Sequence, residues 1–320
     1  MTESKRVVVF GATGFIGTEV VRALRDRGVT VLPMATPRLP PVRADQAKDF
    51  LQHFSNEIGC LAHHLRLTDC VVNSAGVAEA ASTDEGSLIA ANGVVPGYLA
   101  MAAFMAGVPR FVQVSSAAVQ GRADVLDSSP TIAPFSPYSR SKVLGARLAR
   151  KGHPGTVEYR PPGVHGVDRR VSQVTARIAR SRISSVARPG SSPSPQALLN
   201  NVADAIAFLA TSQVPPPAIV AHPSEGLTTA SVLFLLGRRQ PFEIPRTLAK
   251  LLVAMGMVCG RVVPPVMVNT RRIEMLWFGQ SQAPSWLTDA GWKPPAGQDA
   301  WKELGRLLAE RSSGRDETHM

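Results

Sequence analysis

The chain has 320 residues, of which 44% are apolar and 18% are charged. This composition is typical of a packed globular protein rather than a disordered one. The length suits one large α/β domain, or a nucleotide-binding domain with a smaller lobe. The net charge of +11 fits either a basic surface without a specific partner or a cleft that attracts polyanions, such as a dinucleotide or a nucleotide sugar. Nucleic acid is not expected as a partner, because the basic residues are dispersed and no aromatic platform accompanies them.

The cysteines and the apolar segments bear on the compartment. Cys60, Cys70 and Cys259 form no CxxC pair and no ligand set with histidine, so we expect a reducing compartment and no bound metal. The first six residues lead directly into a strand and leave no room for a signal peptide. The most apolar later segment, 248–263, is interrupted by two basic residues and two glycines and is too short to cross a bilayer. We therefore expect a cytoplasmic protein with no membrane partner.

A glycine-rich turn follows the first expected strand, Arg6–Phe10. Gly11 permits the tight turn, Gly14 keeps side chains away from a pyrophosphate, and Gly17 lets the next helix pack closely on the sheet. That helix, expected over 18–27, directs its unpaired N–H groups at the phosphates. The G-x-x-G-x-x-G spacing between a strand and a helix favours nucleotide binding over a plain turn. The predicted cofactor-binding residues of the turn are Gly11, Thr13, Gly14, Phe15, Ile16 and Gly17.

The second expected strand, 29–33, ends at Pro33, because proline cannot donate a hydrogen bond to a sheet. An acidic residue at this point would hold the ribose 2′-hydroxyl of NAD, but the sequence is Met34-Ala-Thr-Pro-Arg38. Arg38, with Thr36, is placed to bind a ribose 2′-phosphate, and a solvated arginine is the alternative. NADP(H) is therefore the preferred cofactor, and NAD(H) stays open.

Strands and helices alternate through the rest of the first half. We expect helices over 44–65, 92–106 and 138–150, and strands over 69–73, 110–115 and 156–160. This order predicts an α/β fold with a doubly wound parallel sheet, whose ligand cleft lies at the carboxyl ends of the strands. The small residues expected at those ends, where a ribose would lie, are Ser74, Ala75 and Gly76, followed in the chain by Ser115 and Ser116.

Tyr138 and Lys142 are the second chemical signal. They lie four residues apart and so share one face of the expected helix. An ammonium beside a phenol stabilises the phenolate. A tyrosine tuned in this way exchanges a proton with a carbonyl or carbinol oxygen while hydride moves at the adjacent carbon. Ser116 would hydrogen-bond the same oxygen. A surface pair without a task is the alternative, and the preceding nucleotide turn and serine-tipped strand count against it.

These segments together resemble the extended short-chain dehydrogenases/reductases, the group of nucleotide-sugar epimerases, dehydratases and ketoreductases. The motifs that carry the resemblance occur in the family's order and are GATGFIG (11–17), NSAG (73–76), the helix of Asn92, VSSAAVQG (114–121), SPYSRSK (136–142), RPPGVHG (160–166) and, more weakly, NNVADAIA (200–207). The resemblance implies Ser116, Tyr138 and Lys142 as catalytic residues, and Asn92, Tyr138 and Lys142 as cofactor-binding residues. It also implies that Pro161, Gly163 and Val164 meet the nicotinamide, and that a homodimer forms through two helices per subunit.

The domain division follows the same resemblance. We expect a Rossmann domain over 1–165 and a smaller C-terminal substrate lobe over 166–311, with some of its segments returning to the Rossmann core. Residues 312–320 are expected to form a flexible tail.

Departures from the family's sequence pattern reduce the number of reactions expected for this chain. Gln120 stands where a tyrosine is common, and no strand with an adenine-binding aspartate is evident between Arg38 and Asp69. Ala117-Ala118 occupies the place of the Asp-Glu pair of the sugar dehydratases, which argues against dehydration. The candidate substrate contacts are Ser116, Ala117, His165 and Arg271. The alternative for His165 is a polar loop residue that binds nothing, and the alternative for Arg271 is a solvated arginine.

The expected function is an NADP(H)-dependent reductase of a keto group, on a nucleotide-activated sugar, with Tyr138 as the proton donor. One alternative is an NAD-dependent nucleotide-sugar epimerase, which would use the same residues. Another is a non-catalytic dinucleotide-binding sensor, and the presence of both Tyr138 and Lys142 counts against it.

Overall fold

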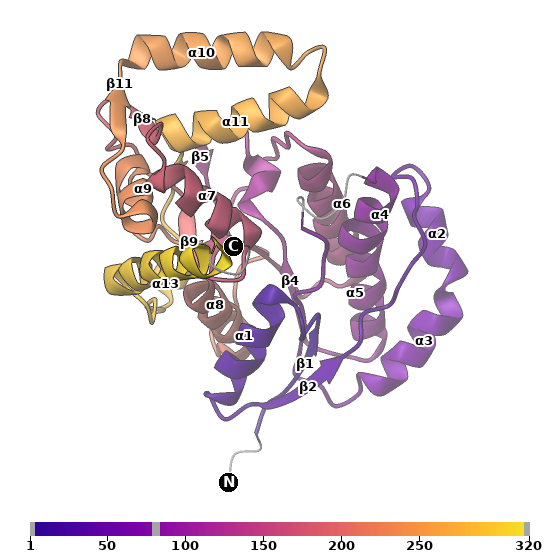
Figure 1. The fold of residues 1–320 in the computed structure, drawn as a ribbon. Coiled ribbons are helices and arrows are strands. Elements are labelled where there is room, and N and C mark those ends of the chain that lie inside the picture. The colour runs from indigo at the N-terminus through magenta and orange to yellow at the C-terminus, as the bar shows by residue number, and fades with distance from the viewer. Residues whose placement is uncertain (1–3, 79–83, 317–320) are drawn as a thin grey trace.

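The computed structural model describes residues 4–78 and 84–316. Its centre is a six-stranded parallel sheet in the order β10-β6-β4-β3-β1-β2 (Figure 1). The strands are β1 (Arg6–Phe10), β2 (Thr30–Met34), β3 (Cys70–Asn73), β4 (Arg110–Val114), β6 (Thr156–Arg160) and β10 (Ile219–Ala221). This sheet confirms the predicted doubly wound α/β fold.

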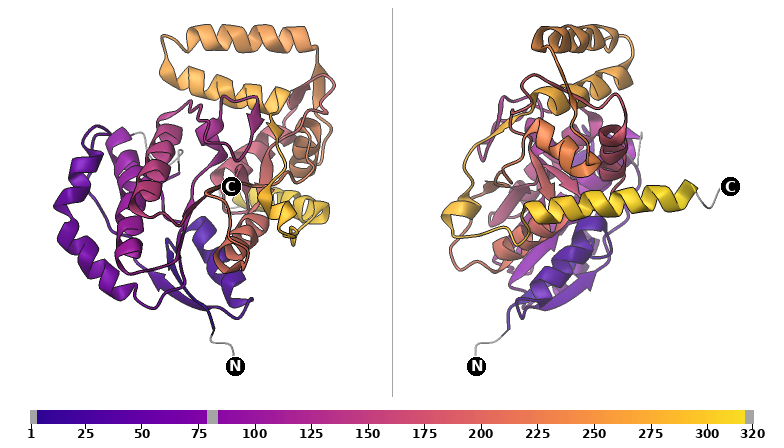
Figure 2. Two further views of the ribbon diagram at one scale, coloured as in Figure 1. Left: turned by 180° about the vertical axis from the view of Figure 1, so that it is seen from behind. Right: turned by 60° about the vertical axis from the view of Figure 1, so that its left-hand side comes forward.

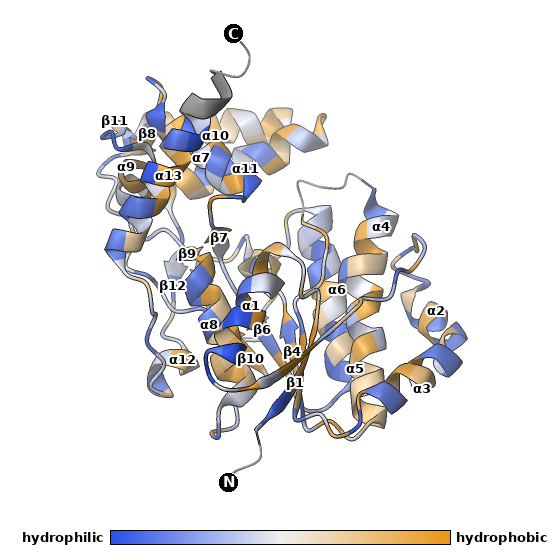
Figure 3. Ribbon diagram, turned by 60° about the horizontal axis from the view of Figure 1, so that its bottom comes forward, coloured by the Kyte–Doolittle hydropathy of each residue, from blue (hydrophilic) through white to orange (hydrophobic). Residues whose placement is uncertain are grey.

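Helices cover both faces of the sheet, which explains why its strands are apolar on both sides. Val7 and Val9 of β1 pack with α1 (Phe15–Arg25) and α8 (Leu199–Thr211). Val8 and Phe10 point to the other face, which is covered by α2 (Ala47–His53), α3 (Ser55–His64), α5 (Val95–Met105) and α6 (Pro137–Gly152). Figure 3 shows the hydrophobic colour on the central strands and along much of α5.

The point where strand order reverses lies between β1 and β3. The chain leaves β1 for the edge strand β2 and then returns to the other side of β1 as β3. The carboxyl ends of β1 and β3 therefore border one crevice, and a doubly wound fold binds its ligand in such a crevice. The glycine turn and Ser74–Gly76 meet there.

The second half of the chain contributes to both parts of the molecule. β10 is a strand of the central sheet and α8 packs on one of its faces, whereas a second apolar cluster forms around Trp301. The elements outside the central sheet's layers are η3 (Ala117–Gln120), β5 (Val125–Leu126), β7 (Gly163–His165), α7 (Arg170–Arg180), β8 (Ser185–Ala187), β9 (Gln196–Leu198), α9 (Thr229–Gly237), β11 (Phe242–Ile244), α10 (Arg246–Cys259), α11 (Pro264–Phe278), β12 (Ser281–Gln282), α12 (Trp286–Asp289) and α13 (Gln298–Asp316). In Figures 1 and 2, α10 and α11 form a hairpin at the end of the molecule opposite the N-terminus.

Four sequence expectations differ from the structure. Pro33 lies inside β2 rather than ending it, which is tolerated because β2 is an edge strand and pairs on one side only. The helix expected over 44–65 is two helices that meet at Phe54. The helix expected to open at Asn92 begins at Glu85 with α4 (Glu85–Ile89) and includes a π-helical turn, η2 (Ala90–Val94). The expected flexible tail is helical through Asp316, and the rest of it lies outside the described residues.

One continuous helical stretch of the described chain, Glu85–Met105, is long and apolar enough to cross a bilayer. However, 78% of its most apolar window is buried inside the fold. Its side chains pack against the sheet and against α3 and α6, as in the core helix of a water-soluble domain.

Candidate functional site

The glycine turn after β1 has the geometry of a phosphate cradle. Gly11 adopts a φ of 75°, and a Cβ there would lie 2.6 Å from the Ala75 backbone nitrogen. A Cβ on Gly17 would lie 2.0 Å from the Gly11 carbonyl oxygen, so only glycine permits this close packing of α1. Gly14 is exposed and forms the N-cap of α1, where it directs the helix N-terminus at the crevice. Thr13 is exposed beside it, and Phe15 and Ile16 are half-buried at the start of the helix.

The loop after β3 forms the opposite side of the crevice. The Ser74 hydroxyl donates to the Phe10 carbonyl oxygen at 2.7 Å, which ties this loop to the end of β1. Gly76 leaves space where a Cβ would lie 2.6 Å from Asn92 Oδ1 and 3.0 Å from Lys142 Nζ. The two loops therefore meet as backbone without bulky side chains, with the Lys142 ammonium beside Gly76, and a dinucleotide site requires this kind of lining.

Asn92 holds this loop in place rather than facing solvent. It is fully buried in η2, accepts from the Val77 N–H at 3.0 Å and donates to the Val77 carbonyl oxygen at 2.9 Å. Its Nδ2 also donates to Ser141 Oγ of α6 at 3.2 Å. A π-helical turn at such a residue is common at functional sites. Asn92 therefore couples the cofactor-side loop to the helix that carries Tyr138 and Lys142.

Tyr138, Lys142 and Ser116 come from two neighbouring elements. Ser136 caps α6 in a capping box, which fixes the first turn that contains Tyr138. Lys142 Nζ lies 5.9 Å from the centre of the Tyr138 ring and donates to the Val114 carbonyl oxygen at 3.3 Å. Burial, and then the charge of Arg169, lower the pKa of Lys142 to about 8. Ser116 Oγ accepts from the Ala118 N–H at 3.1 Å, and its own proton is left to donate to another oxygen.

The turn after β6 packs against the Ser116 segment. The Pro161 carbonyl oxygen accepts from the Ala117 N–H at 2.8 Å. Gly163 is exposed and Val164 is buried in β7, which pairs with β9. His165 lies away from the open surface. It is 2% exposed and shares a 2.8 Å hydrogen bond with Gln196 Oε1, so this geometry does not support its predicted contact with substrate.

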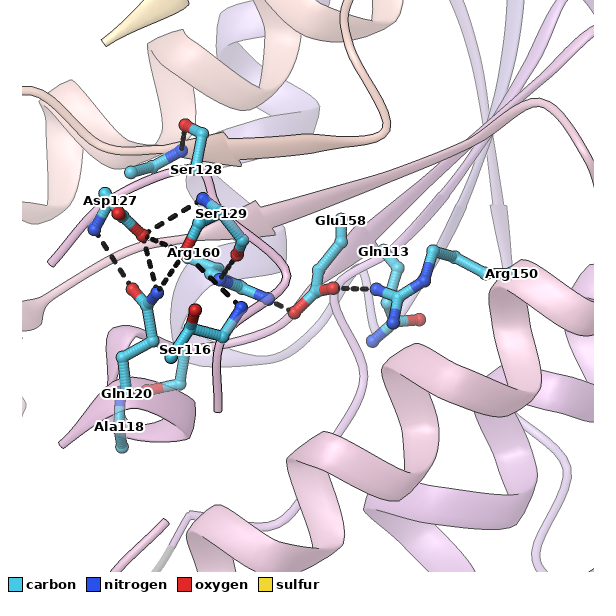
Figure 4. A network of polar contacts seen from close by, with 12 residues as sticks. Gln113, Ser116, Ala118, Gln120, Asp127, Ser128, Ser129, Arg150, Glu158 and Arg160 are labelled. Atoms are coloured by element: carbon cyan, nitrogen blue, oxygen red, sulfur yellow. Dashed lines mark hydrogen bonds and ion pairs between the residues drawn. The ribbon is translucent and has the colours of Figure 1, made fainter. Parts of the chain in front are cut away.

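A buried polar network fixes the strand ends beneath the site (Figure 4). Glu158 and Arg160 are 1% and 2% exposed and form a 2.9 Å ion pair, and Arg150 binds the second oxygen of the same carboxylate. Arg160 also donates to the Ser129 carbonyl oxygen at 2.8 Å. This compensated charge cluster joins β6, α6 and the loop after β5. Sequence reasoning missed it, because Glu158 and Arg160 lie within an apolar strand pattern.

The region expected to bind the adenosine end of the cofactor, which includes Arg38, agrees in part with the sequence prediction. Arg38 is exposed four residues beyond the end of β2, and no acidic residue ends that strand. The described chain between Arg38 and Asp69 forms two helices and no strand, as expected for the missing adenine-binding segment. The preference for a 2′-phosphate stays a prediction.

A cavity of about 340 Å³ lies between the α10–α11 hairpin and the loop before α6. Its lining residues are Arg122, Phe135, Met257, Arg261, Met267, Arg271 and Glu274. Arg271 donates to the Gly121 carbonyl oxygen at 2.9 and 2.6 Å and pairs with Glu274 at 2.7 Å, so its guanidinium is largely committed within the protein. Arg122 and Arg261 are exposed and are the better candidates to contact an anion.

Sequence reasoning missed three arginines at the site. Arg122 and Arg261 come from segments far apart in the chain, and only the folded hairpin brings them together. The Arg169 guanidinium lies 5.1 Å from the centre of the Phe15 ring, above the glycine turn. Its position next to the 160–166 motif is the one signal that could have found it.

Comparison with known proteins places these features in a family. The model of the NAD dependent epimerase/dehydratase family matches residues 7–182, which is more than half of the chain. No curated protein sequence matches the chain significantly.

Solved structures with the same fold cover nearly the whole chain. MoeE5 in complex with UDP-glucuronic acid and NAD is 19% identical, with 96% of this chain and 99% of that chain covered and a TM-score of 0.63. TunA, an NAD dependent NDP-hexosamine 5,6-dehydratase involved in tunicamycin biosynthesis, is 21% identical and has a TM-score of 0.63. The match covers 97% of this chain and 98% of TunA. The dTDP-4-dehydrorhamnose reductase of Bacillus anthracis str. Ames in complex with NADP is 15% identical and has a TM-score of 0.60. The match covers 96% of this chain and 99% of the reductase.

The family match covers the glycine turn, the Gly76 loop and the Tyr138–Lys142 helix, which the structure gathers at one crevice. The chain therefore belongs to the NAD dependent epimerase/dehydratase family and is an NAD(P)-dependent enzyme of the extended short-chain dehydrogenase/reductase type.

Proposed function

We propose that the protein is an NADP(H)-dependent reductase of a keto group on a nucleotide-activated sugar. The observation that carries this proposal is the position of Lys142, buried against the Gly76 loop and 5.9 Å from the Tyr138 ring. One ammonium would thereby act on both the cofactor's ribose and the phenol. The nicotinamide, when bound, supplies the hydride.

Side chains of the protein bind and protonate the carbonyl oxygen of the substrate. Ser116 donates a hydrogen bond to that oxygen and keeps its proton, because the bond it accepts from the Ala118 N–H leaves its own O–H available as a donor. Tyr138 gives the oxygen a proton, and the Lys142 ammonium stabilises the phenolate that is left. Lys142 is held toward them by the Val114 carbonyl oxygen.

The cavity under the hairpin supports a substrate that carries negative charge. Arg122, Arg261 and Arg271 all line it, and Met257 and Phe135 supply apolar surface. Guanidinium groups bind diphosphates in a bidentate manner. Phe135 lies three residues before Tyr138, so the cavity lies next to the start of α6. A nucleotide diphosphate in this cavity would direct its sugar toward Tyr138.

Ala117 and Ala118 favour reduction over dehydration, because neither side chain can remove a proton from a sugar carbon. The absence of an acidic residue after β2, with Arg38 beyond it, favours NADP(H). The dTDP-4-dehydrorhamnose reductase among the similar structures was solved with NADP, whereas MoeE5 was solved with NAD. We propose that this chain, like that reductase, binds NADP(H).

The test is a panel of nucleotide-linked keto sugars, assayed for oxidation of NADPH and of NADH. The proposal predicts turnover of at least one of them with NADPH preferred. Protein that retains NAD through gel filtration and interconverts two sugar epimers without net oxidation of added cofactor would contradict it and favour an epimerase.

A homodimer formed through two helices of each subunit is also proposed, on the family resemblance. Sedimentation equilibrium of the purified protein tests it directly.

A further inference from the structure

The α10–α11 hairpin leaves one face of α10 without a partner. The two helices pack closely because α10 presents glycines to α11: a Cβ on Gly256 would lie 2.5 Å from Thr270 Oγ1, and one on Gly260 would lie 2.7 Å from Met267. Of the residues in α10, Ala249 and Val253 are buried on this contact side. The opposite side of α10 faces away from the protein (Figures 1 and 2).

That outer face is apolar. It carries Leu248, Leu251, Leu252, Met255 and Val258, each between 44% and 59% exposed. Their spacing of three, one, three and three residues places them on one side of a helix. Val262 and Val263 continue the surface into the turn after α10, and Val262 is 85% exposed. Eight of the 20 large apolar side chains that are exposed among the described residues lie between Arg246 and Ile273, so exposure of this kind is concentrated on the hairpin.

The hairpin is strongly basic. Residues 246–278 include five basic residues and one acidic residue, Glu274, which pairs with Arg271. Arg246, Lys250, Arg261 and Arg272 are exposed. A surface of exposed aliphatic side chains among basic ones is the pattern of a helix that lies in the interface of an anionic bilayer.

Two other occupants fit this face less well. A second copy of the chain, related by two-fold symmetry, would bring the same patch of positive charge against itself. A protein partner is expected to meet aromatic anchors, yet the outer face of α10 consists of Leu, Met and Val without Trp or Tyr.

We propose that the α10–α11 hairpin docks the protein on an anionic membrane surface, with the outer face of α10 in the headgroup region. This departs from the expectation of no membrane partner, which rested on the segment being too short to span a bilayer. Lying on the surface needs no such length. Met257 of α10 and Arg261 of the turn after it line the cavity, so the cavity lies directly beneath the docked hairpin.

The test measures binding of the full-length protein to vesicles, without substrate or cofactor, so that it is independent of the proposed activity. Sedimentation with vesicles of equal parts phosphatidylglycerol and phosphatidylcholine is compared with pure phosphatidylcholine. The proposal predicts binding to the anionic vesicles that weakens with added salt. Leu251→Gln is expected to lower the partition coefficient about tenfold, and Lys250→Gln about fivefold. Leu67→Gln, which changes an exposed leucine at the turn before β3, is the matched control and leaves binding unchanged.

The two exposed cysteines provide a second, site-resolved measurement. Cys259 ends α10, Cys60 lies on α3, and Cys70 is buried. An environment-sensitive fluorophore on Cys259 of a Cys60→Ser protein is expected to shift to the blue when anionic vesicles are added. The same fluorophore on Cys60 of a Cys259→Ser protein is expected not to shift.

The proposal is overturned if the wild-type protein does not bind the anionic vesicles, or if both fluorophores respond alike. It is also overturned if Leu251→Gln leaves vesicle binding intact and instead dissociates an oligomer in sedimentation equilibrium, which would identify the face as a contact between copies.

Discussion

The Lys142 ammonium nitrogen lies 5.9 Å from the centre of the Tyr138 ring. It is held there by the Val114 carbonyl oxygen at 3.3 Å, and Asn92 fixes the adjoining loop that faces it. The lysine is 7% exposed, which places its charge in a region of low dielectric where it acts strongly on nearby groups. The chemistry proposed for the site depends on this charge.

The charge of Lys142 makes binding of the cofactor depend on pH. The pKa of Lys142 is lowered to about 8 by burial and by Arg169. Above this value the lysine is neutral, so we expect NADPH affinity to fall as pH rises through 8. Arg169→Gln removes a positive neighbour, which favours the protonated lysine and moves the midpoint to higher pH. Fluorescence titration with NADPH across this pH range checks the shift, and Arg170→Gln, at an exposed neighbouring position, is expected to leave the midpoint unchanged.

Arg38 is expected to determine the choice between NADP(H) and NAD(H). Replacing it with alanine removes one charge-assisted bond to a 2′-phosphate, so the dissociation constant for NADPH should rise about tenfold or more while that for NADH stays the same. Arg43→Ala, in the same exposed segment, is the matched control. Equal losses for both cofactors in Arg38→Ala would show that this arginine does not read the phosphate.

Gly17 is expected to tolerate no side chain. In Gly17→Ala the new Cβ meets the Gly11 carbonyl oxygen at 2.0 Å, and we expect a loss of at least about 2 kcal/mol in the free energy of unfolding together with loss of dinucleotide binding. Gly59→Ala in α3 is the control, because a Cβ there has no neighbour within 4 Å. It should stabilise the protein by about 0.5–1 kcal/mol through helix propensity. A denaturant titration of both variants measures the contrast.

His165 is expected to make stability depend on pH. Burial lowers the pKa of His165 to about 4, from 6.5 when solvated. Above pH 6.5 the histidine is neutral in both the folded and the unfolded chain and contributes no pH dependence. As pH falls from 6.5 to 4 the unfolded chain takes up a proton that the folded chain does not, so stability falls, by up to about 3 kcal/mol.

The variant that tests this is His165→Gln, in which the slope of unfolding free energy against pH should flatten over that interval. His64→Gln, at the exposed end of α3, should keep the wild-type slope. An unchanged slope in His165→Gln would assign the pH dependence to other groups.

Local patterns were sufficient to predict the elements that carry the cofactor crevice. The apolar run of β1, the glycines after it and the Tyr138–Lys142 spacing each depend on neighbours within a few residues, and the structure places them as expected. The break at Phe54 and the π-helical turn at Asn92 depend on packing against α5 and α6. No residue propensity near Phe54 or Asn92 predicts either the break or the π-helical turn.

The cavity arginines show why the rest of the site was not predictable. Arg122 follows η3 and Arg261 follows α10, and they share a cavity only because the hairpin folds back over the loop before α6. Arg261 was visible in the sequence only as an interruption of an apolar segment. Arg271 was predicted as a substrate contact, but much of its hydrogen-bonding capacity is used by Gly121 and Glu274.

The most direct test of the central claim is the rate of NADPH oxidation by Tyr138→Phe with a keto sugar that the wild type reduces. Removing the phenol hydroxyl removes the proton donor while the ring stays in place beside Lys142. The account predicts a loss of about a hundredfold to ten-thousandfold in kcat/KM, and Arg140→Gln, an exposed position of the same helix, should retain the wild-type rate. A Tyr138→Phe protein that reduces the sugar as fast as the wild type would contradict the account.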